Sequence, residues 1–187
     1  MNKQRCGWVK LTDETYVSYH DNEWGKPLFD ETKLFELFSL ETQAAGLSWL
    51  TVLKKRESYK KAFANFDINI VSKFTSKEID EIMKKYDVIR NRAKLEAIVI
   101  NANLFLQIQK EFESIKNYFW DKTNNKPVVN FVANYKQAPT TSKLSDDITK
   151  DLKKRGFKFV GSISIYAFLQ ACGIINDHEE SCFCKNI

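Results

Sequence analysis

Apolar positions recur every three or four residues along most of this chain, which predicts a protein built from helices. Residues 34–45 show the pattern clearly, and Glu41 falls on their apolar face, where an unpaired charge is costly to bury. The apolar members of this face are Leu34, Leu37 and Phe38. Gly46 ends the helix, and Trp49 follows. An inward acid beside a turn and an aromatic suits a pocket; the alternative is a Glu paired with Lys or Arg in the interior.

The same periodicity predicts further helices. Residues suited to capping or starting a helical turn precede several segments: Ser48, Asp67, Thr75 with Glu78, Asn91 and Ser145. The expected helical segments are residues 49–63, 76–86, 91–109, 111–120, 145–156 and 157–173. The last is apolar on nearly all sides and should be the central buried helix. Residues 1–27 should be irregular, and residues 128–135 suit a short helix or a strand. The fold class is therefore all-α, with about eight helices.

Composition narrows the class of protein further. The chain has 187 residues, 43% of them hydrophobic, which is enough for one domain with a real core. Its 6 Gly and 3 Pro argue against a β-sandwich or a disordered chain. A net charge of +5 permits a nucleic-acid partner without requiring one. No apolar run suggests a signal peptide or membrane span, so we expect a cytoplasmic protein with reduced thiols.

Both histidines of the chain lie near cysteines at its two ends. The candidate metal ligands are Cys6, His20, His178 and Cys182. Two Cys and two His are a common tetrahedral set for structural zinc, with no open position for water. The alternatives are surface histidines, cysteines buried as small hydrophobes, or Cys184 as a ligand. Asp21 and Asp177, each next to a histidine, are candidates for orienting the imidazole rings.

Five segments together resemble a known family. They are RCGW (5–8), YHDNEWG (19–25), AGLSWLTVLKKRESY (45–59), LKKRGFKFVG (152–161) and QACGIINDH (170–178). This set resembles the DNA-3-methyladenine glycosylase I family and spans almost the whole chain. The resemblance implies a zinc-containing branch of the helix-hairpin-helix glycosylases, with the four residues above as zinc ligands. It implies one domain over residues 1–187, with a helical core at about 28–160 and a zinc-tied lobe of residues 1–27 and 161–187.

The resemblance also assigns a base pocket. Glu41 would hydrogen-bond the extruded base, and Trp49 would stack on it. The other pocket residues would be Tyr19, Trp8, Tyr16 and Trp24. Leu47 would wedge into the gap in the duplex. The connector at residues 86–91 departs from the family pattern because it has no glycine, and the catalytic Asp of the wider superfamily has no clear counterpart.

This chemistry requires a base taken out of the stack, at a cost of a few kcal/mol. 3-Methyladenine in DNA is cationic, so an aromatic pocket with a carboxylate favours it over neutral adenine. We expect hydrolysis by water, alkylated duplex DNA as partner, free 3-methyladenine as product, and a monomer without membrane attachment. Candidate phosphate contacts are Lys54, Lys55, Arg90, Arg92, Lys94, Lys153, Lys154 and Lys158. The alternatives are a non-catalytic lesion-binding module and a zinc-stapled interaction protein.

Overall fold

The computed structural model describes residues 3–186 and is mostly helical, which confirms the predicted class. The helices are α1 (Glu14–Asn22), α2 (Glu31–Ala44), α3 (Trp49–Leu53), α4 (Arg56–Ala62), α5 (Ile68–Val71), α6 (Ser76–Lys85), α7 (Arg92–Phe112), α8 (Ile115–Trp120), α9 (Lys143–Arg155) and α10 (Ser162–Ala171). Three 3-10 turns add η1 (Ala64–Phe66), η2 (Asp121–Thr123) and η3 (Tyr135–Gln137). Strands β1 (Val128–Val129) and β2 (Ile175–Asn176) pair in parallel, with Val128 opposite Ile175. Residues 1, 2 and 187, at the ends of the predicted lobe, lie outside the described residues.

Side-chain caps start the helices where the sequence places them. Ser48 accepts a hydrogen bond from the Thr51 N–H at the start of α3, and Asn91 does the same for Lys94 in α7. Asp67 caps α5, and Thr75 forms the predicted capping box with Glu78 before α6. Each of these caps satisfies backbone donors that the first helical turn leaves unpaired. Four of the five predicted caps are therefore confirmed.

Two predictions near the N-terminus are wrong. Residues 14–22 form α1 instead of irregular chain, because Asp13 caps the Tyr16 N–H and supplies the start signal. The helix expected over residues 49–63 is two helices, α3 and α4, joined at Lys54 and Lys55. The backbone of Lys55 leaves the helical region at φ −99° and ψ 1°, although neither Gly nor Pro marks the break.

Three predictions in the second half are also corrected. Ser142 caps α9, and Ser145 lies at the third helical position and completes the capping box, so the helix starts earlier than expected. Helix α10 begins at Ser162 instead of residue 157, and Ile163 is 65% exposed, so its first turn is not buried on all sides. Of the two alternatives for residues 128–135, the helix is wrong and the strand is confirmed only at β1, and the segment ends at the start of η3.

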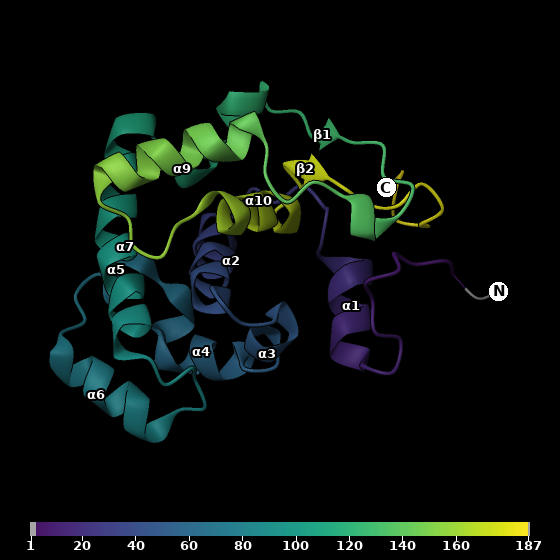
Figure 1. Cartoon of the computed structure of the whole chain (residues 1–187). Helices are drawn as coiled ribbons and strands as arrows, with labels where there is room; N and C mark the ends of the chain where they lie inside the picture. The colour runs from purple at the N-terminus through teal and green to yellow at the C-terminus, as the bar shows by residue number, and fades with distance from the viewer. Residues whose placement is uncertain (1–2, 187) are drawn as a thin grey trace.

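Helix α2 is the centre of the packing. Every residue from Leu34 to Gln43 is buried, because α10, α3, α7 and α8 surround the helix. The aromatic ring of Phe38 contacts rings from α7, α8, the α9–α10 connection and α10. Figure 1 shows α2 in the middle of the molecule, with α1 and both chain ends on one side and α6 with α7 on the other. Among the described residues, no helix has the length and apolar character needed to cross a membrane.

Candidate active site and metal centre

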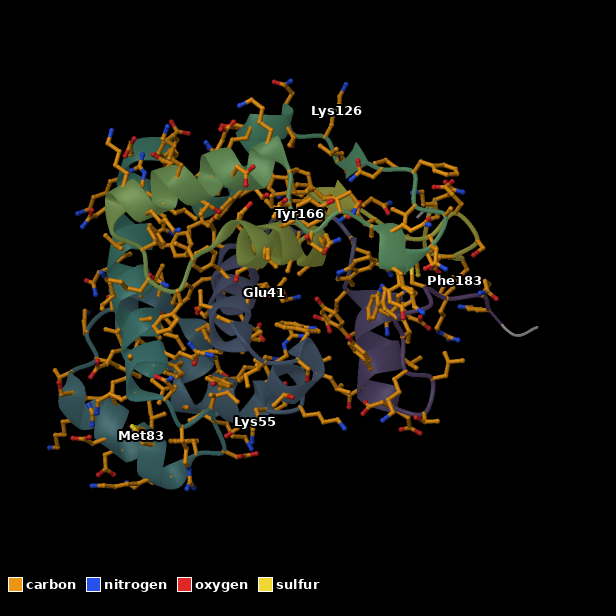
Figure 2. The ribbon with its side chains drawn as sticks, viewed as in Figure 1. Glu41, Lys55, Met83, Lys126, Tyr166 and Phe183 are labelled. Atoms are coloured by element: carbon orange, nitrogen blue, oxygen red, sulfur yellow. The ribbon has the colours of Figure 1, made fainter. Side chains whose placement is uncertain are left out.

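A cavity of about 280 Å³ opens beside the C-terminal part of α2. One wall comes from α1, α2, α3 and the N-terminal segment, and the other from η3, the chain after it, α10 and the end of β2. Its lining residues are Trp8, Tyr16, Tyr19, Trp24, Glu41, Trp49, Tyr135, Ala138, Pro139, Thr140, Ala167, Gln170 and Asp177. The structure therefore brings Glu41 and all five aromatic residues expected in a base pocket to one cavity. Figure 2 shows Glu41 in the interior, close to α10.

Glu41 is the chemically unusual residue of this cavity. Its side chain is buried, with 8% of the residue exposed, and no described residue gives it a hydrogen bond or an ion pair. Burial alone raises the pKa of Glu41 to about 8. Glu36, one and a half turns earlier on α2, accepts a 2.6 Å hydrogen bond from Arg56 Nε. The alternative that Glu41 pairs with a lysine or arginine is therefore wrong, and Glu36 fills that structural role.

Aromatic rings form most of the remaining surface on this side of the cavity. The rings of Tyr19 and Trp49 lie 5.4 Å apart, and Trp8 packs at 5.0 Å against both Tyr16 and Trp24. The indole N–H of Trp49 is buried without a partner among the described residues. Burial, followed by the nearby Glu41 carboxyl, raises the pKa of Tyr19 well above its usual value. The arrangement can hold a flat, positively charged ring by stacking and by cation–π attraction.

The opposite wall contains polar residues that the sequence analysis did not place in the pocket. Asp177 accepts 2.7 Å hydrogen bonds from the side chains of Asn130, Tyr166 and Gln170. The prediction that Asp177 orients His178 is wrong, because His178 Nε2 faces the carbonyl oxygen of Trp24 at 3.1 Å. Sequence adjacency suggested the wrong partner, since the backbone after β2 directs consecutive side chains to different sides.

The turn that follows α2 carries Leu47, which is 44% exposed and does not line the cavity. Gly46 adopts φ +76° there, a conformation that favours glycine. Lys94, from the first turn of α7, donates hydrogen bonds to the carbonyl oxygens of Gln43 at 2.9 Å and Ala45 at 2.6 Å. Lys94 thereby ties α7 to this turn. Because it is buried, the expectation that Lys94 contacts phosphate is wrong.

Three more of the residues expected to contact phosphate form ion pairs within the protein. Lys54 lies 2.6 Å from Asp13, Lys55 pairs with Asp87, and Arg92 pairs with Asp80 and with Glu96. The candidates that are exposed and have no ion pair to a described residue are Arg90, Lys153, Lys154 and Lys158. Arg90 belongs to the connector at residues 86–91, which joins α6 to α7. The basic residues available to a polyanion are thus fewer than the composition indicates.

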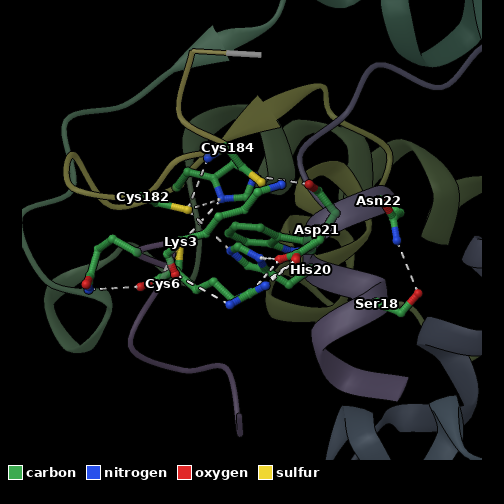
Figure 3. A network of polar contacts seen from close by, with 12 residues as sticks. Lys3, Cys6, Ser18, His20, Asp21, Asn22, Cys182 and Cys184 are labelled. Carbon is green, nitrogen blue, oxygen red and sulfur yellow. Dashed lines mark hydrogen bonds and ion pairs between the residues drawn. The ribbon is translucent and has the colours of Figure 1, made fainter. Parts of the chain in front are cut away.

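The chain ends meet in a cluster of metal-ligand type. Cys6, His20, His178 and Cys182 are all buried, and one ligand atom from each lies within 4.8 Å of the others. His178 Nδ1 is 3.4 Å from Cys6 Sγ and 3.5 Å from Cys182 Sγ, and His20 Nε2 is 3.4 Å from Cys182 Sγ. The structure therefore assembles a group that could hold a metal ion. Figure 3 shows this cluster and its polar contacts.

Contacts around the cluster orient its side chains. His20 Nδ1 lies 2.8 Å from Asp21, which Arg5 also contacts, so the predicted role of Asp21 is confirmed. Burial lowers the pKa of His178 to about 4, so the ring is neutral, the form that a metal binds. Cys184 forms a second group of potential metal ligands together with His20 and Asp21. This second group does not include His178. Trp24 connects cluster and cavity, because its carbonyl faces His178 and its side chain lines the pocket.

The fold and the cavity together are those of a DNA glycosylase. The chain belongs to the methyladenine glycosylase family, whose model matches residues 8–185. It is 49% identical over 181 residues to a DNA-3-methyladenine glycosylase of Haemophilus influenzae, covering 97% of both chains. It is 45% identical to DNA-3-methyladenine glycosylase 1 of Escherichia coli, covering 97% of this chain and 96% of the relative. A crystal structure of a tyrosine-to-phenylalanine variant of 3-methyladenine DNA glycosylase I in complex with 3-methyladenine matches with a TM-score of 0.92, 38% identity and 97% coverage of each chain.

Proposed function

We propose that this chain hydrolyses the N-glycosidic bond of 3-methyladenine in alkylated duplex DNA, acts on an extruded base and leaves the DNA strands intact. The observation that carries the proposal is Glu41, a buried carboxyl without a hydrogen-bond or ion-pair partner among residues 3–186, inside a cavity of aromatic rings. An unpaired buried acid is unfavourable in a plain core, but it suits a site that receives a cation.

The pocket selects its substrate by charge. A cationic methylated base that enters beside Glu41 favours the ionised carboxylate and donates a charge-assisted hydrogen bond to it. The rings of Tyr19 and Trp49 stack on the base, while Trp8, Tyr16 and Trp24 form the surrounding surface. Neutral adenine gains less from both interactions. Because the cationic base leaves as a neutral molecule, its departure needs little help from a protonating group.

Base extrusion requires a group that takes the place of the base and a contact that holds the backbone. Leu47 supplies the exposed apolar wedge, and Lys94 fixes the turn that presents it. We interpret α6, the connector at 86–91 and α7 as a helix-hairpin-helix element. Because the connector lacks glycine, Arg90 provides its phosphate contact, whereas Arg92 remains in its ion pairs. Tyr59 links this connector to α2, since its hydroxyl accepts from the Ile89 N–H and donates to Gln43.

The Cys/His cluster fits a structural zinc ion. In a tetrahedron with Zn–S distances of about 2.3 Å and Zn–N distances of about 2.1 Å, sulfur and nitrogen lie about 3.6 Å apart. The Sγ–N distances of 3.4, 3.4 and 3.5 Å in the cluster agree with this spacing. Cys6, His20, His178 and Cys182 would hold the ion, which would stabilise the contact between the two chain ends. With four protein ligands the metal leaves no open position for substrate.

We further interpret the chain as one glycosylase domain that acts as a monomer. The core of about residues 28–160 and the lobe of residues 1–27 and 161–187 both contribute residues to each wall of the cavity, so both are needed for the site. All four cysteines are buried free thiols, which agrees with a reducing cytoplasm, where the DNA substrate also lies.

An assay for released base tests the proposed function. The purified chain is incubated with methylated duplex DNA, and the released bases are separated by chromatography. We expect free 3-methyladenine in the supernatant and abasic sites in otherwise unbroken strands. Binding to the DNA without base release would identify a non-catalytic lesion-binding module. If the chain neither binds the DNA nor releases a base, the remaining interpretation is a zinc-stapled interaction protein.

A further inference from the structure

The polar wall of the cavity contains a glutamine whose amide orientation is determined by chemistry. Gln170 lines the cavity, and its Nε2 donates a 2.7 Å hydrogen bond to Asp177 Oδ2. An ionised carboxylate can only accept, so the amide nitrogen must face Asp177. The carbonyl oxygen Oε1 of Gln170 therefore points away from Asp177. This oxygen has no hydrogen-bond partner among the described residues. The buried polar side-chain atoms that lack a partner do not include it, so Oε1 is accessible to solvent.

Asp177 is itself held firmly in place. Three neutral donors, the side chains of Asn130, Tyr166 and Gln170, each approach one of its oxygens at 2.7 Å. Only 3% of the residue is exposed, and no described cation forms an ion pair with it. A carboxylate bound in this way is a rigid acceptor that fixes its partners.

We propose that Gln170 and Asp177 hold the water that attacks the sugar, with Gln170 Oε1 accepting a hydrogen bond from that water and Asp177 acting as the positioning residue. This inference rests on the proposed function. The aromatic wall and Glu41 bind the base, so the opposite wall faces the sugar side of the extruded nucleotide. Of the residues that line the opposite wall, Gln170 is the one with a fixed side-chain acceptor that is still open to solvent.

The reaction balances without a further reactant. The oxygen of the held water forms a bond to C1′ of the deoxyribose while the bond from C1′ to the purine nitrogen breaks. The electron pair of that bond leaves on the purine, which changes from a cation to a neutral base. One water proton passes to solvent. The fixed amide of Gln170 supplies the orientation of the attacking water, and Asp177 holds that amide in place.

Substitutions separate this role from base binding. We expect Gln170→Ala and Asp177→Asn each to lower the single-turnover excision rate by about 10- to 100-fold, because the attacking water loses its oriented position. Both variants should bind free 3-methyladenine as the unaltered chain does. The double variant should be no slower than the slower single variant, because the two residues act as one unit. Gln109→Ala is the matched control, since Gln109 Nε2 also donates to a carboxylate, that of Glu31, outside the cavity.

A nucleophile-competition measurement gives a readout that a purely structural role would not change. In buffer that contains methanol, the ratio of methyl deoxyriboside to free sugar ends should rise in both variants, because the water has lost its oriented position. Zinc content and thermal midpoint are measured on the same samples, and Gln170→Ala tests the inference even if Asp177→Asn fails to fold. Unchanged excision in Gln170→Ala, an unchanged product ratio, or a matching loss of base affinity would each overturn the inference. If the unaltered chain releases no base, the proposed function itself fails.

Discussion

Replacing Glu41 by glutamine tests whether a buried, protonated acid lies at the centre of the pocket. The exchange preserves the size of the side chain and removes its ability to ionise. In the folded protein, burial raises the pKa of Glu41 from 4.5 to about 8. The unfolded chain should titrate near the lower value. Folding stability must therefore depend on pH through this residue, and the glutamine variant must lose that dependence.

The sign and size follow from proton linkage. Below about pH 4.5 the carboxyl is protonated in both states, so the full contribution of Glu41 to stability is present. As the pH rises, the unfolded state ionises first, and the free energy of unfolding falls by about 1.4 kcal/mol per pH unit until about pH 8. The total loss through this group is about 5 kcal/mol. Glu41→Gln should therefore gain stability relative to the unaltered chain as the pH increases.

Urea unfolding of both proteins at pH 5, 6, 7 and 8 measures this difference. Glu36→Gln is the matched control on the same helix, and it should be destabilised because it weakens the ion pair to Arg56. Excision by Glu41→Gln should fall by about 10- to 100-fold, as expected for a lost charge-assisted hydrogen bond of about 1.5–3 kcal/mol. A stability difference between Glu41→Gln and the unaltered chain that stays constant with pH would refute the buried-acid reasoning. Normal excision would remove Glu41 from the chemistry.

Three further predictions concern the aromatic wall, the wedge and the metal cluster. Trp49→Ala should weaken binding of free 3-methyladenine by about 5- to 30-fold through lost stacking, measured by calorimetry; unchanged affinity would place Trp49 in the core only. Leu47→Ala should slow excision from duplex DNA several-fold while free-base affinity stays constant, and an equal loss in both assays would contradict a wedge. Elemental analysis should find about one zinc per chain. The Cys6→Ser, Cys182→Ser double variant should lose the metal and melt at lower temperature, whereas retained zinc would point to Cys184.

Local signals in the sequence predicted the beginnings of several helices. Caps such as Ser48 and Asn91 act on backbone donors within three residues, so no distant contact is needed to recognise them. The break at Lys54 and Lys55 has no such signal. It coincides with contacts to Asp13 and Asp87, residues that are distant in the sequence. Ser142 and Ser145 are both good caps, and only the structure shows which one begins the helix.

Several residues of the candidate site were predictable because they lie in the sequence segments that resemble the glycosylase family. Glu41 stood out because an acid on an apolar face requires an explanation, and in the part of the chain that the structure describes it has no hydrogen-bond or ion-pair partner. The polar wall was not predictable, since Gln170 and Asp177 become neighbours only when β2 turns back beside α10. Lys94 was assigned to the surface because lysine is rarely buried. Two carbonyl groups at the end of α2 compensate its ammonium group.

The position of the metal-ligand cluster has a consequence for biosynthesis. Two of its ligands, Cys6 and His20, precede the other two, His178 and Cys182, by more than 150 residues, so a ribosome must add all the residues between them before the cluster can close. Trp24 touches the late-arriving His178 through its carbonyl, so the aromatic wall acquires its final support at the same moment. A chain synthesised only as far as the residues before His178 would therefore hold the wedge and the acid yet lack a finished pocket, and it would leave nearby DNA bases untouched until the last two ligands are added.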